Sequence, residues 1–340
     1  MSVRPLRRAG ALAALALLAA CEGRQNALDP AGPRAAAEAA MFWVMSGLGT
    51  AVFLATMAAL AWAVLHRKRA PETPSLATRD PARERGAAKW VVGALGVSTL
   101  ILAGLLVADL LTGRAMGQRP EGKTLNVAIT ARQWWWEVVY EDPQPSRILR
   151  TANEIHVPVG RPVLVRLQAG DVIHSFWVPN LTGKRDLVPG YRHTTWFRAD
   201  RAGVYRGQCA EYCGLQHAKM ALLVIAEPPD SFAAWYARQL RDSPPPPDTL
   251  AARGQQVFLS RQCVMCHTVR GTPASASVAP DLTHLASRRT LAAGTLPNTR
   301  GHLAGWVTDP QRIKPGTQMP ANALPPADLR ALLAYLESLR

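Results

Sequence analysis

Two long uncharged segments constrain the fold of this chain more than any other feature of its sequence. Residues 41–65 carry no charge, and residues 90–111 carry only Asp109. Each segment exceeds the roughly 20 apolar residues that cross a bilayer as a helix. A basic cluster, which begins at residues 66–69, lies between the two segments. Two core helices of a soluble domain would not explain why it is there. The sequence therefore predicts a transmembrane hairpin over residues 38–114.

The charge of the chain fits this interpretation. Its net charge of +15 could indicate nucleic acid, an anionic membrane surface or an acidic partner. Much of the basic excess near the spans lies between them, and by the positive-inside rule that loop is cytoplasmic. Everything after the second span then lies on the outer side. We expect membrane lipid as a partner, and no nucleic acid.

The N-terminus has the pattern of an export signal. Three arginines precede a short apolar run, which ends Leu18-Ala19-Ala20-Cys21. This ending resembles a bacterial lipobox, so residues 1–20 are predicted to be a lipoprotein-type signal peptide and Cys21 to be lipidated. The alternative is ordinary cleavage with Cys21 incidental. Signal and topology together indicate a multi-pass protein of the bacterial inner membrane, with its later domains on the periplasmic side.

The remainder of the chain predicts two domains. Residues 121–230 contain short β-rich runs broken by turns, typical of a β-sandwich or Greek-key barrel: 125–130, 134–140, 151–157, 163–167, 173–178, 194–197 and 221–227. A short helix is expected over 231–241 and a proline-rich linker over 242–248. Residues 249–340 alternate helical stretches with loops and end on an amphipathic helix, 327–339. The fold class is a membrane-anchored multidomain protein with an all-β and an all-α domain.

The all-α domain carries a haem attachment motif. Residues 263–267 read Cys-Val-Met-Cys-His, in which two thiols bind the porphyrin and the histidine binds iron. Met319, in a proline-flanked loop, is the predicted sixth ligand. Its competitors, His284 and His302, are expected at the surface. A redox disulfide or half a zinc site is the alternative. The predicted haem c residues are Cys263, Cys266, His267 and Met319.

A second cluster of soft ligands lies in residues 209–220. Two thiols, an imidazole and a thioether within this segment prefer copper, and the position between two β-runs resembles a cupredoxin ligand loop. One cysteine suffices for a blue-copper site, so the second thiolate implies a second copper. His174, at the start of a predicted strand, supplies the further histidine. A Cys209–Cys213 disulfide is the alternative in an oxidising compartment.

These residues resemble a known family. The pattern Cys-x-Glu-x-Cys-x-x-x-His-x-x-Met, with Asp-x-x-His-Ser upstream, is similar to the binuclear copper (CuA) domain of subunit II of haem-copper cytochrome c oxidases. Residues 133–137 resemble that family's aromatic patch, and residues 184–190 its loop near subunit I. One branch of the family carries a fused C-terminal cytochrome c domain. The resemblance implies a cupredoxin-like domain followed by a class I cytochrome c domain.

The resemblance also implies roles for individual residues. One copper would be held by His174, Cys209, Cys213 and Met220. The other would be held by His217, both cysteines and the Glu211 carbonyl. The Glu211 carboxylate would face a magnesium ion shared with subunit I, and Trp134 would be the electron-transfer tryptophan above the copper. Because side chains alternate along a strand, at least one of Trp134, Trp135 and Trp136 is expected to be core.

The implied function is electron transfer from haem c through CuA to subunit I, where oxygen is reduced to water and protons are translocated. The expected partners are subunit I, the other oxidase subunits and an external donor such as a soluble or membrane cytochrome c. Two alternatives stay open: the CuA subunit of a membrane nitric oxide reductase, and a membrane-anchored electron carrier. Ala87 departs from the family, because many members carry a glutamate there at a proton channel.

The linker suggests how the two redox domains meet. A tether at Pro244–Pro247 raises the local concentration of one domain near the other, and we expect this to replace docking affinity between them. The external donor would then meet the haem domain first. Residues 248–340 have ten Lys and Arg against five Asp and Glu, so a donor with an acidic face would be steered to this domain.

Overall fold

The computed structural model describes residues 25–66, 81–118 and 120–340. The predicted signal peptide 1–20 and Cys21 lie outside the described residues. The chain divides into two compact units, of which one comprises residues 37–119 and the other comprises the remaining residues.

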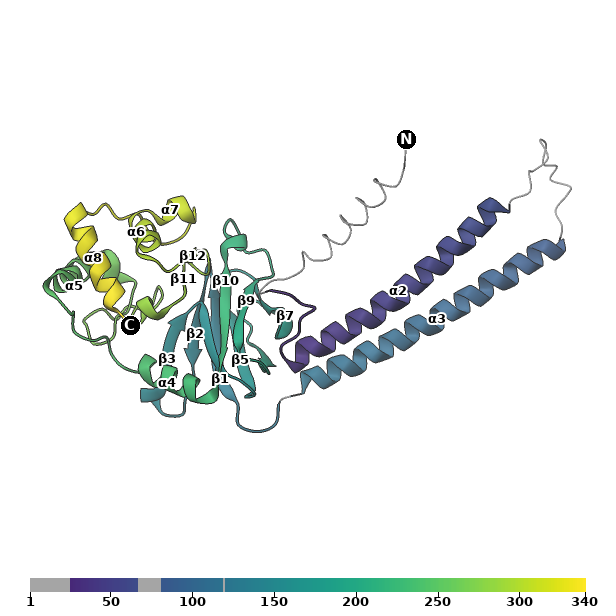
Figure 1. Cartoon of the computed structure of the whole chain (residues 1–340), viewed down its shortest axis with the longest axis horizontal. Coiled ribbons are helices and arrows are strands. Elements are labelled where there is room, and N and C mark those ends of the chain that lie inside the picture. The colour runs from purple at the N-terminus through teal and green to yellow at the C-terminus, as the bar shows by residue number, and fades with distance from the viewer. Residues whose placement is uncertain (1–24, 67–80, 119) are drawn as a thin grey trace, which may run out of the picture. The chain divides into compact units, whose positions relative to one another are not determined.

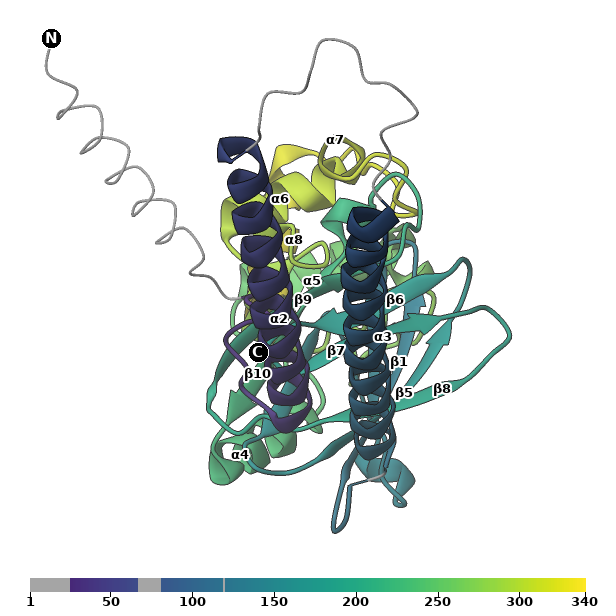
Figure 2. The same cartoon turned by 90° about the vertical axis from the view of Figure 1, so that its right-hand side faces the viewer.

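The first unit is a pair of long helices, α2 (Pro33–Leu65) and α3 (Pro81–Gly117), which run alongside each other (Figures 1 and 2). Their most apolar windows have mean hydropathies of 2.0 and 2.4 and are 0% buried. Apolar surface of this length and exposure is unfavourable in water and favourable in a bilayer. Both predicted spans lie inside these helices, which anchor the protein to a membrane.

The second unit begins with a β-sandwich of two five-stranded sheets. Their orders are β3-β2-β1-β5-β8 and β4-β10-β9-β6-β7. The strands are β1 (Leu125–Arg132), β2 (Trp135–Tyr140), β3 (Leu149–Ala152), β4 (Glu154–Pro158), β5 (Val163–Ala169), β6 (His174–Val178), β7 (Thr182–Leu187), β8 (His193–Phe197), β9 (Gly203–Cys209) and β10 (Ala221–Glu227). Pairs β1–β5 and β4–β10 are parallel, and the other pairs are antiparallel. Alternate residues of β1, such as Val127 and Ile129, are fully buried between the sheets.

The structure corrects the predicted strands in two places. The run at 151–157 is not one strand, because the chain crosses at Asn153 from β3 in one sheet to β4 in the other. Asn153 has a φ of 63° and accepts a hydrogen bond from the Trp136 amide at 2.9 Å. Strands β7 and β9 were not predicted. β7 is mostly polar, and β9 contains two glycines, so neither has the usual strand composition.

The helical part of this unit is built around its own core. It follows α4 (Pro229–Gln239) and contains α5 (Thr249–Ser260), α6 (Arg300–Thr308), α7 (Pro310–Ile313), α8 (Pro326–Ser338) and the short strands β11 (Thr290–Leu291) and β12 (Leu296–Pro297). Helices α5 and α8 cross closely, with the rings of Phe258 and Tyr335 centred 5.9 Å apart. The Asp248 side chain accepts from the Ala251 amide at 2.7 Å and caps α5.

Replacing Gly254 with alanine should destabilise this helical domain. A Cβ at Gly254 would lie 1.9 Å from the Ala331 carbonyl oxygen, so α5 and α8 would have to separate. We expect a loss of about 1–3 kcal/mol in the free energy of unfolding, typical of overpacking. Thermal unfolding of the purified protein measures it. Gly301→Ala is the matched control, because nothing lies within 4 Å of a Cβ there. Equal melting temperatures for the two variants would contradict the close crossing.

Candidate metal and haem centres

Three soft or imidazole ligands meet at one end of the β-sandwich. His174 begins β6, Cys209 ends β9, and Cys213 lies in the loop from β9 to β10. Their ligand atoms all lie within 4.8 Å of one another, and all three residues are buried. The two sulfur atoms are 3.8 Å apart, and both cysteines are free thiols, so the disulfide alternative is wrong here. Because metal–sulfur bonds are about 2.3 Å long, both sulfurs can reach an ion placed between them.

The other predicted copper ligands surround this pair. Cys213 Sγ lies 3.7 Å from His217 Nδ1 and 3.9 Å from Met220 Sδ. Cys209 Sγ lies 3.8 Å from His174 Nδ1 and 3.2 Å from the Glu211 carbonyl oxygen. Two thiols, two imidazoles, a thioether and a carbonyl thus converge on one small volume. This donor set fits two soft metal ions that share the sulfurs.

Hydrogen bonds prepare the site for a metal. The carboxylate of Asp171 accepts from His174 Nε2 at 2.8 Å, which turns Nδ1 toward the sulfurs. The hydrogen bond with the Cys213 thiol, joined by one with His174, holds the pKa of the Cys209 thiol well below its ordinary value. The same bond raises the pKa of Cys213. Cys209 is therefore poised as a thiolate, the form of cysteine that binds metals.

The three tryptophans have separate environments. Trp136 is fully buried in the sandwich core, which fits the expectation from alternation. Trp134 is 7% exposed, and its Nε1 donates to the Cys213 carbonyl at 2.9 Å. Gln133 Nε2 donates to the same carbonyl at 2.8 Å. Trp134 is thus joined directly to the backbone of a predicted copper ligand. Trp135 is half-buried and lines a cavity that also contains the predicted haem residues.

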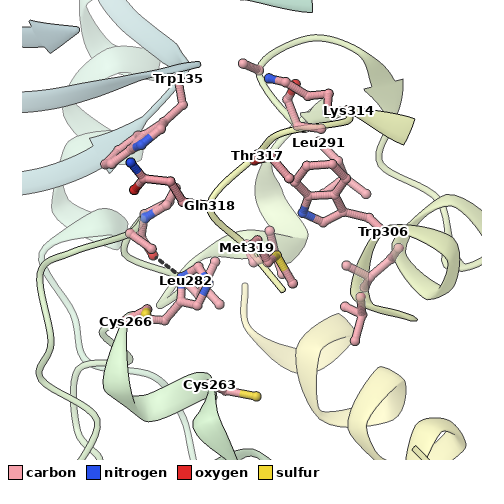
Figure 3. A pocket seen from close by; sticks show the side chains of 18 of the residues that line it. Trp135, Cys263, Cys266, Leu282, Leu291, Trp306, Lys314, Thr317, Gln318 and Met319 are labelled. Carbon is pink, nitrogen blue, oxygen red and sulfur yellow. Dashed lines mark hydrogen bonds between the residues drawn. The ribbon is translucent and has the colours of Figure 1, made fainter. Parts of the chain in front are cut away.

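A large, mostly apolar cavity in the helical domain contains all four predicted haem residues. Cys263, Cys266, His267 and Met319 line it, and Figure 3 shows Met319 and the two cysteines around it. His267 Nδ1 donates to the Pro280 carbonyl at 2.7 Å, which leaves its other ring nitrogen as the ligand. Burial lowers the pKa of His267 and favours the neutral imidazole that iron binds. These residues fit a covalently attached haem.

The two competing histidines do not line the cavity. His302 is exposed, as expected. His284 is buried, contrary to the surface position predicted for it, because its Nε2 bonds the Arg241 carbonyl at 3.1 Å. Neither histidine lines the cavity, whereas Met265 lines it but is 71% exposed and lies between the two attachment cysteines. Among the candidates for the sixth ligand, the geometry therefore supports Met319.

The expectation that the linker alone holds the haem domain near the β-sandwich is wrong, because the two domains contact each other. Gln133, Trp134, Trp135 and Asn153 of the β-sandwich also line the cavity, and Figure 3 shows Trp135 on one side of it. The buried Glu154 carboxylate accepts from the Arg289 and Thr290 amides at 2.7 and 3.0 Å. The two domains are therefore docked. Sequence reasoning missed these contacts because most of them use backbone groups, which leave no residue signature.

Comparisons with known proteins follow the same division. Residues 141–227 match the family described as cytochrome c oxidase subunit II, periplasmic domain, and residues 251–340 match the cytochrome c family. A cytochrome c oxidase subunit 2 of Alkalihalophilus pseudofirmus is 34% identical over 95% of this chain and 94% of its own length. One from Bacillus sp. (strain PS3) is 33% identical over 71% and 68%. The solved periplasmic domain of oxidase subunit II from Bradyrhizobium japonicum is 30% identical and covers 36% of this chain and 96% of its own, with a TM-score of 0.34.

Proposed function

Because the chain belongs to the cytochrome c oxidase subunit 2 family, with a fused cytochrome c domain, we propose that it accepts electrons at a haem c and delivers them through a CuA centre to subunit I. One observation carries this proposal. Trp134 lines the haem cavity and also donates a hydrogen bond to the carbonyl of Cys213, a predicted copper ligand. The two candidate centres thus share a wall within one chain.

The copper ligands divide into two sets. We assign His174, Cys209, Cys213 and Met220 to one copper, and His217, both cysteines and the Glu211 carbonyl to the other. The division follows the family resemblance, and one histidine lies beside each sulfur: His174 Nδ1 is 3.8 Å from Cys209 Sγ, and His217 Nδ1 is 3.7 Å from Cys213 Sγ. Asp171 holds the His174 ring in place.

Covalent haem attachment is assigned to Cys263 and Cys266, with His267 and Met319 as axial ligands. When bound, the haem and the copper pair supply one-electron transfer, which these side chains lack. The chain's own part is to hold both groups, to exclude water from the space between them, and to orient His174 and His267 by hydrogen bonds. Trp134 is the residue proposed to carry the electron between the two sites.

The magnesium ion next to Glu211 stays a prediction. Lys184 Nζ lies 3.6 Å from the Glu211 carboxylate and 2.8 Å from that of Asp186, so one ammonium already lies against both carboxylates. A magnesium ion would have to displace Lys184 and take oxygen ligands from a partner subunit.

The two apolar helices also suggest an orientation of the chain in the membrane. We propose that the hairpin loop is cytoplasmic and that both redox domains lie on the periplasmic side of a bacterial inner membrane, as the positive-inside rule indicates. Lipidation of Cys21 would add a second anchor. Subunit I and the other oxidase subunits are the proposed partners, with a cytochrome c or another carrier as donor.

Purification of the intact complex tests this function. We expect two coppers and one covalent haem for each copy of this chain, and rapid oxygen consumption with a reduced donor. Nitric oxide supplied without oxygen should not be turned over. Nitric oxide reduction without oxygen consumption would instead support the reductase alternative. A chain that purifies without a catalytic subunit and consumes neither gas would support the free-standing carrier.

A further inference from the structure

A lysine that forms no ion pair with any residue the structure describes lies buried where the two redox domains meet. Lys314 follows α7 in the haem domain, and it is 2% exposed. Its Nζ donates to the Trp134 carbonyl at 2.7 Å, the Lys219 carbonyl at 3.0 Å and the Ala292 carbonyl at 3.2 Å. An ammonium has three donors, so these three carbonyls satisfy it completely. A buried charge is costly unless it is hydrogen-bonded in this way.

The cage around this ammonium requires both domains. Trp134 and Lys219 belong to the β-sandwich, whereas Ala292 and Lys314 belong to the haem domain. If the domains separated, Lys314 would lose two of its three acceptors and water would replace them. Such a group adds little affinity, because docking must remove its hydration, but it strongly favours one geometry over others.

The carbonyls that Lys314 binds lie next to both candidate centres. The Trp134 side chain donates to the Cys213 carbonyl, and Lys219 immediately precedes Met220. On the haem side, Lys314 begins the segment that leads to Met319.

Neighbouring contacts keep this segment close to the sandwich. The Pro315 carbonyl accepts from Gln216 Nε2 at 2.7 Å, and a Cβ at Gly316 would lie 3.6 Å from the Trp134 ring. The Lys314 segment therefore joins the copper-ligand loop to the sixth-ligand loop.

Other contacts besides those of Lys314 also cross between the two domains. The Glu154 carboxylate accepts the hydrogen bonds described above, and the Ala221 amide at the start of β10 donates to the Ala293 carbonyl at 3.0 Å. Loss of Lys314 alone should therefore loosen the alignment of the two loops without detaching the domain. That separates its role from the general stability of the interface.

We propose that Lys314 is a positioning residue that aligns the Met319 loop with Trp134 and the copper-ligand loop, so that electrons cross within a docked unit. The inference rests on the proposed function, in which one electron leaves ferrous haem, which becomes ferric, and reduces the oxidised copper pair. In a docked unit, the transfer rate depends on this alignment and does not depend on the length of the linker at Pro244–Pro247.

The test replaces Lys314 with methionine in the full-length, copper- and haem-loaded chain. Methionine keeps the length and the apolar stem but removes all three donors. We expect haem-to-copper transfer after photoreduction of the haem to slow by about tenfold or more, since small losses of geometry cost rates of this order. Hydrogen exchange at the Ala221 amide should accelerate. The visible spectrum of the haem and the EPR spectrum of the copper pair should stay unchanged, which a misfolded protein would not show.

Two matched variants sharpen the result. Lys123→Met removes an exposed lysine of the same chain and should leave the transfer rate and the exchange unchanged. Lengthening the linker with glycine and serine after Pro247 should not alter transfer in the natural chain, but it should slow transfer in Lys314→Met, where a tether contributes more. Transfer and exchange at natural rates in Lys314→Met with both spectra intact would overturn the proposal.

Lys314→Gln decides the case if the methionine variant loses either spectrum. Glutamine keeps part of the donor capacity, so slower transfer with intact spectra would support the positioning role, and natural transfer and exchange would overturn it. If the unmodified chain itself lacks a shared-electron copper signal or a covalent haem, the proposed function fails. Exchange at Ala221 in Lys314→Met would then still report whether Lys314 aligns the two domains.

Discussion

Replacing Cys213 with serine should abolish the EPR signal of an electron shared between two coppers and leave at most one copper in each chain. Cys213 Sγ is the atom around which the site is arranged, with Cys209 Sγ at 3.8 Å, His217 Nδ1 at 3.7 Å and Met220 Sδ at 3.9 Å. A hydroxyl is a hard, weak ligand for Cu(I), and it cannot bridge two soft ions as a thiolate does. Copper analysis and EPR of the purified chain measure the effect.

A cysteine from the other centre supplies the control. Cys263→Ser removes one haem attachment thiol, and it should leave the shared copper signal intact, because all the proposed copper ligands lie between residues 174 and 220. A shared signal that persists in Cys213→Ser would show that the sulfur bridge is wrongly assigned. A mononuclear copper spectrum in the unmodified chain would exclude two coppers altogether.

The candidate ligands could be predicted because their spacing is local. Five of the six predicted copper ligands lie in residues 209–220, and a loop between two strands has few ways to place them other than around one point. The haem motif is likewise continuous, and Met319 was the one methionine in a rigid loop downstream of it. His174 lay farther away, but its position at the start of a strand put it at the same end of the sandwich as the loop.

The contacts between the domains could not be predicted in this way. Lys314 reaches a carbonyl 180 residues away in the sequence, and every residue has a carbonyl, so its partner leaves no trace in the residue pattern. The partners of Glu154 are backbone amides, which likewise leave no trace in the residue pattern. The break at Asn153 depends on a positive φ, which asparagine tolerates but does not require. Polar β7 has no apolar alternation, because its middle residues are exposed or half-buried.

Removing residues 244–340 should abolish fast turnover with the natural donor while leaving the copper centre spectroscopically intact. The truncation takes away the haem and its ligands but none of the proposed copper ligands. We expect the rate with the natural donor to fall roughly 10²-fold or more, because a centre held in the same chain is replaced by collisions with a separate carrier. Oxygen consumption by the assembled complex measures the loss, and EPR of the same sample checks the copper.

A small artificial reductant distinguishes the two routes by which electrons could reach the copper. In the intact chain Trp134 is 7% exposed, with Gly316 against its ring and Lys314 bonded to its carbonyl. Truncation uncovers this tryptophan, so the reductant should reduce copper faster in the truncated chain, although the natural donor becomes slow. If the truncated complex kept its full rate with the natural donor, that donor would bind the copper domain directly. The docked haem domain would then be an accessory, and its cover over Trp134 would have to open in each turnover.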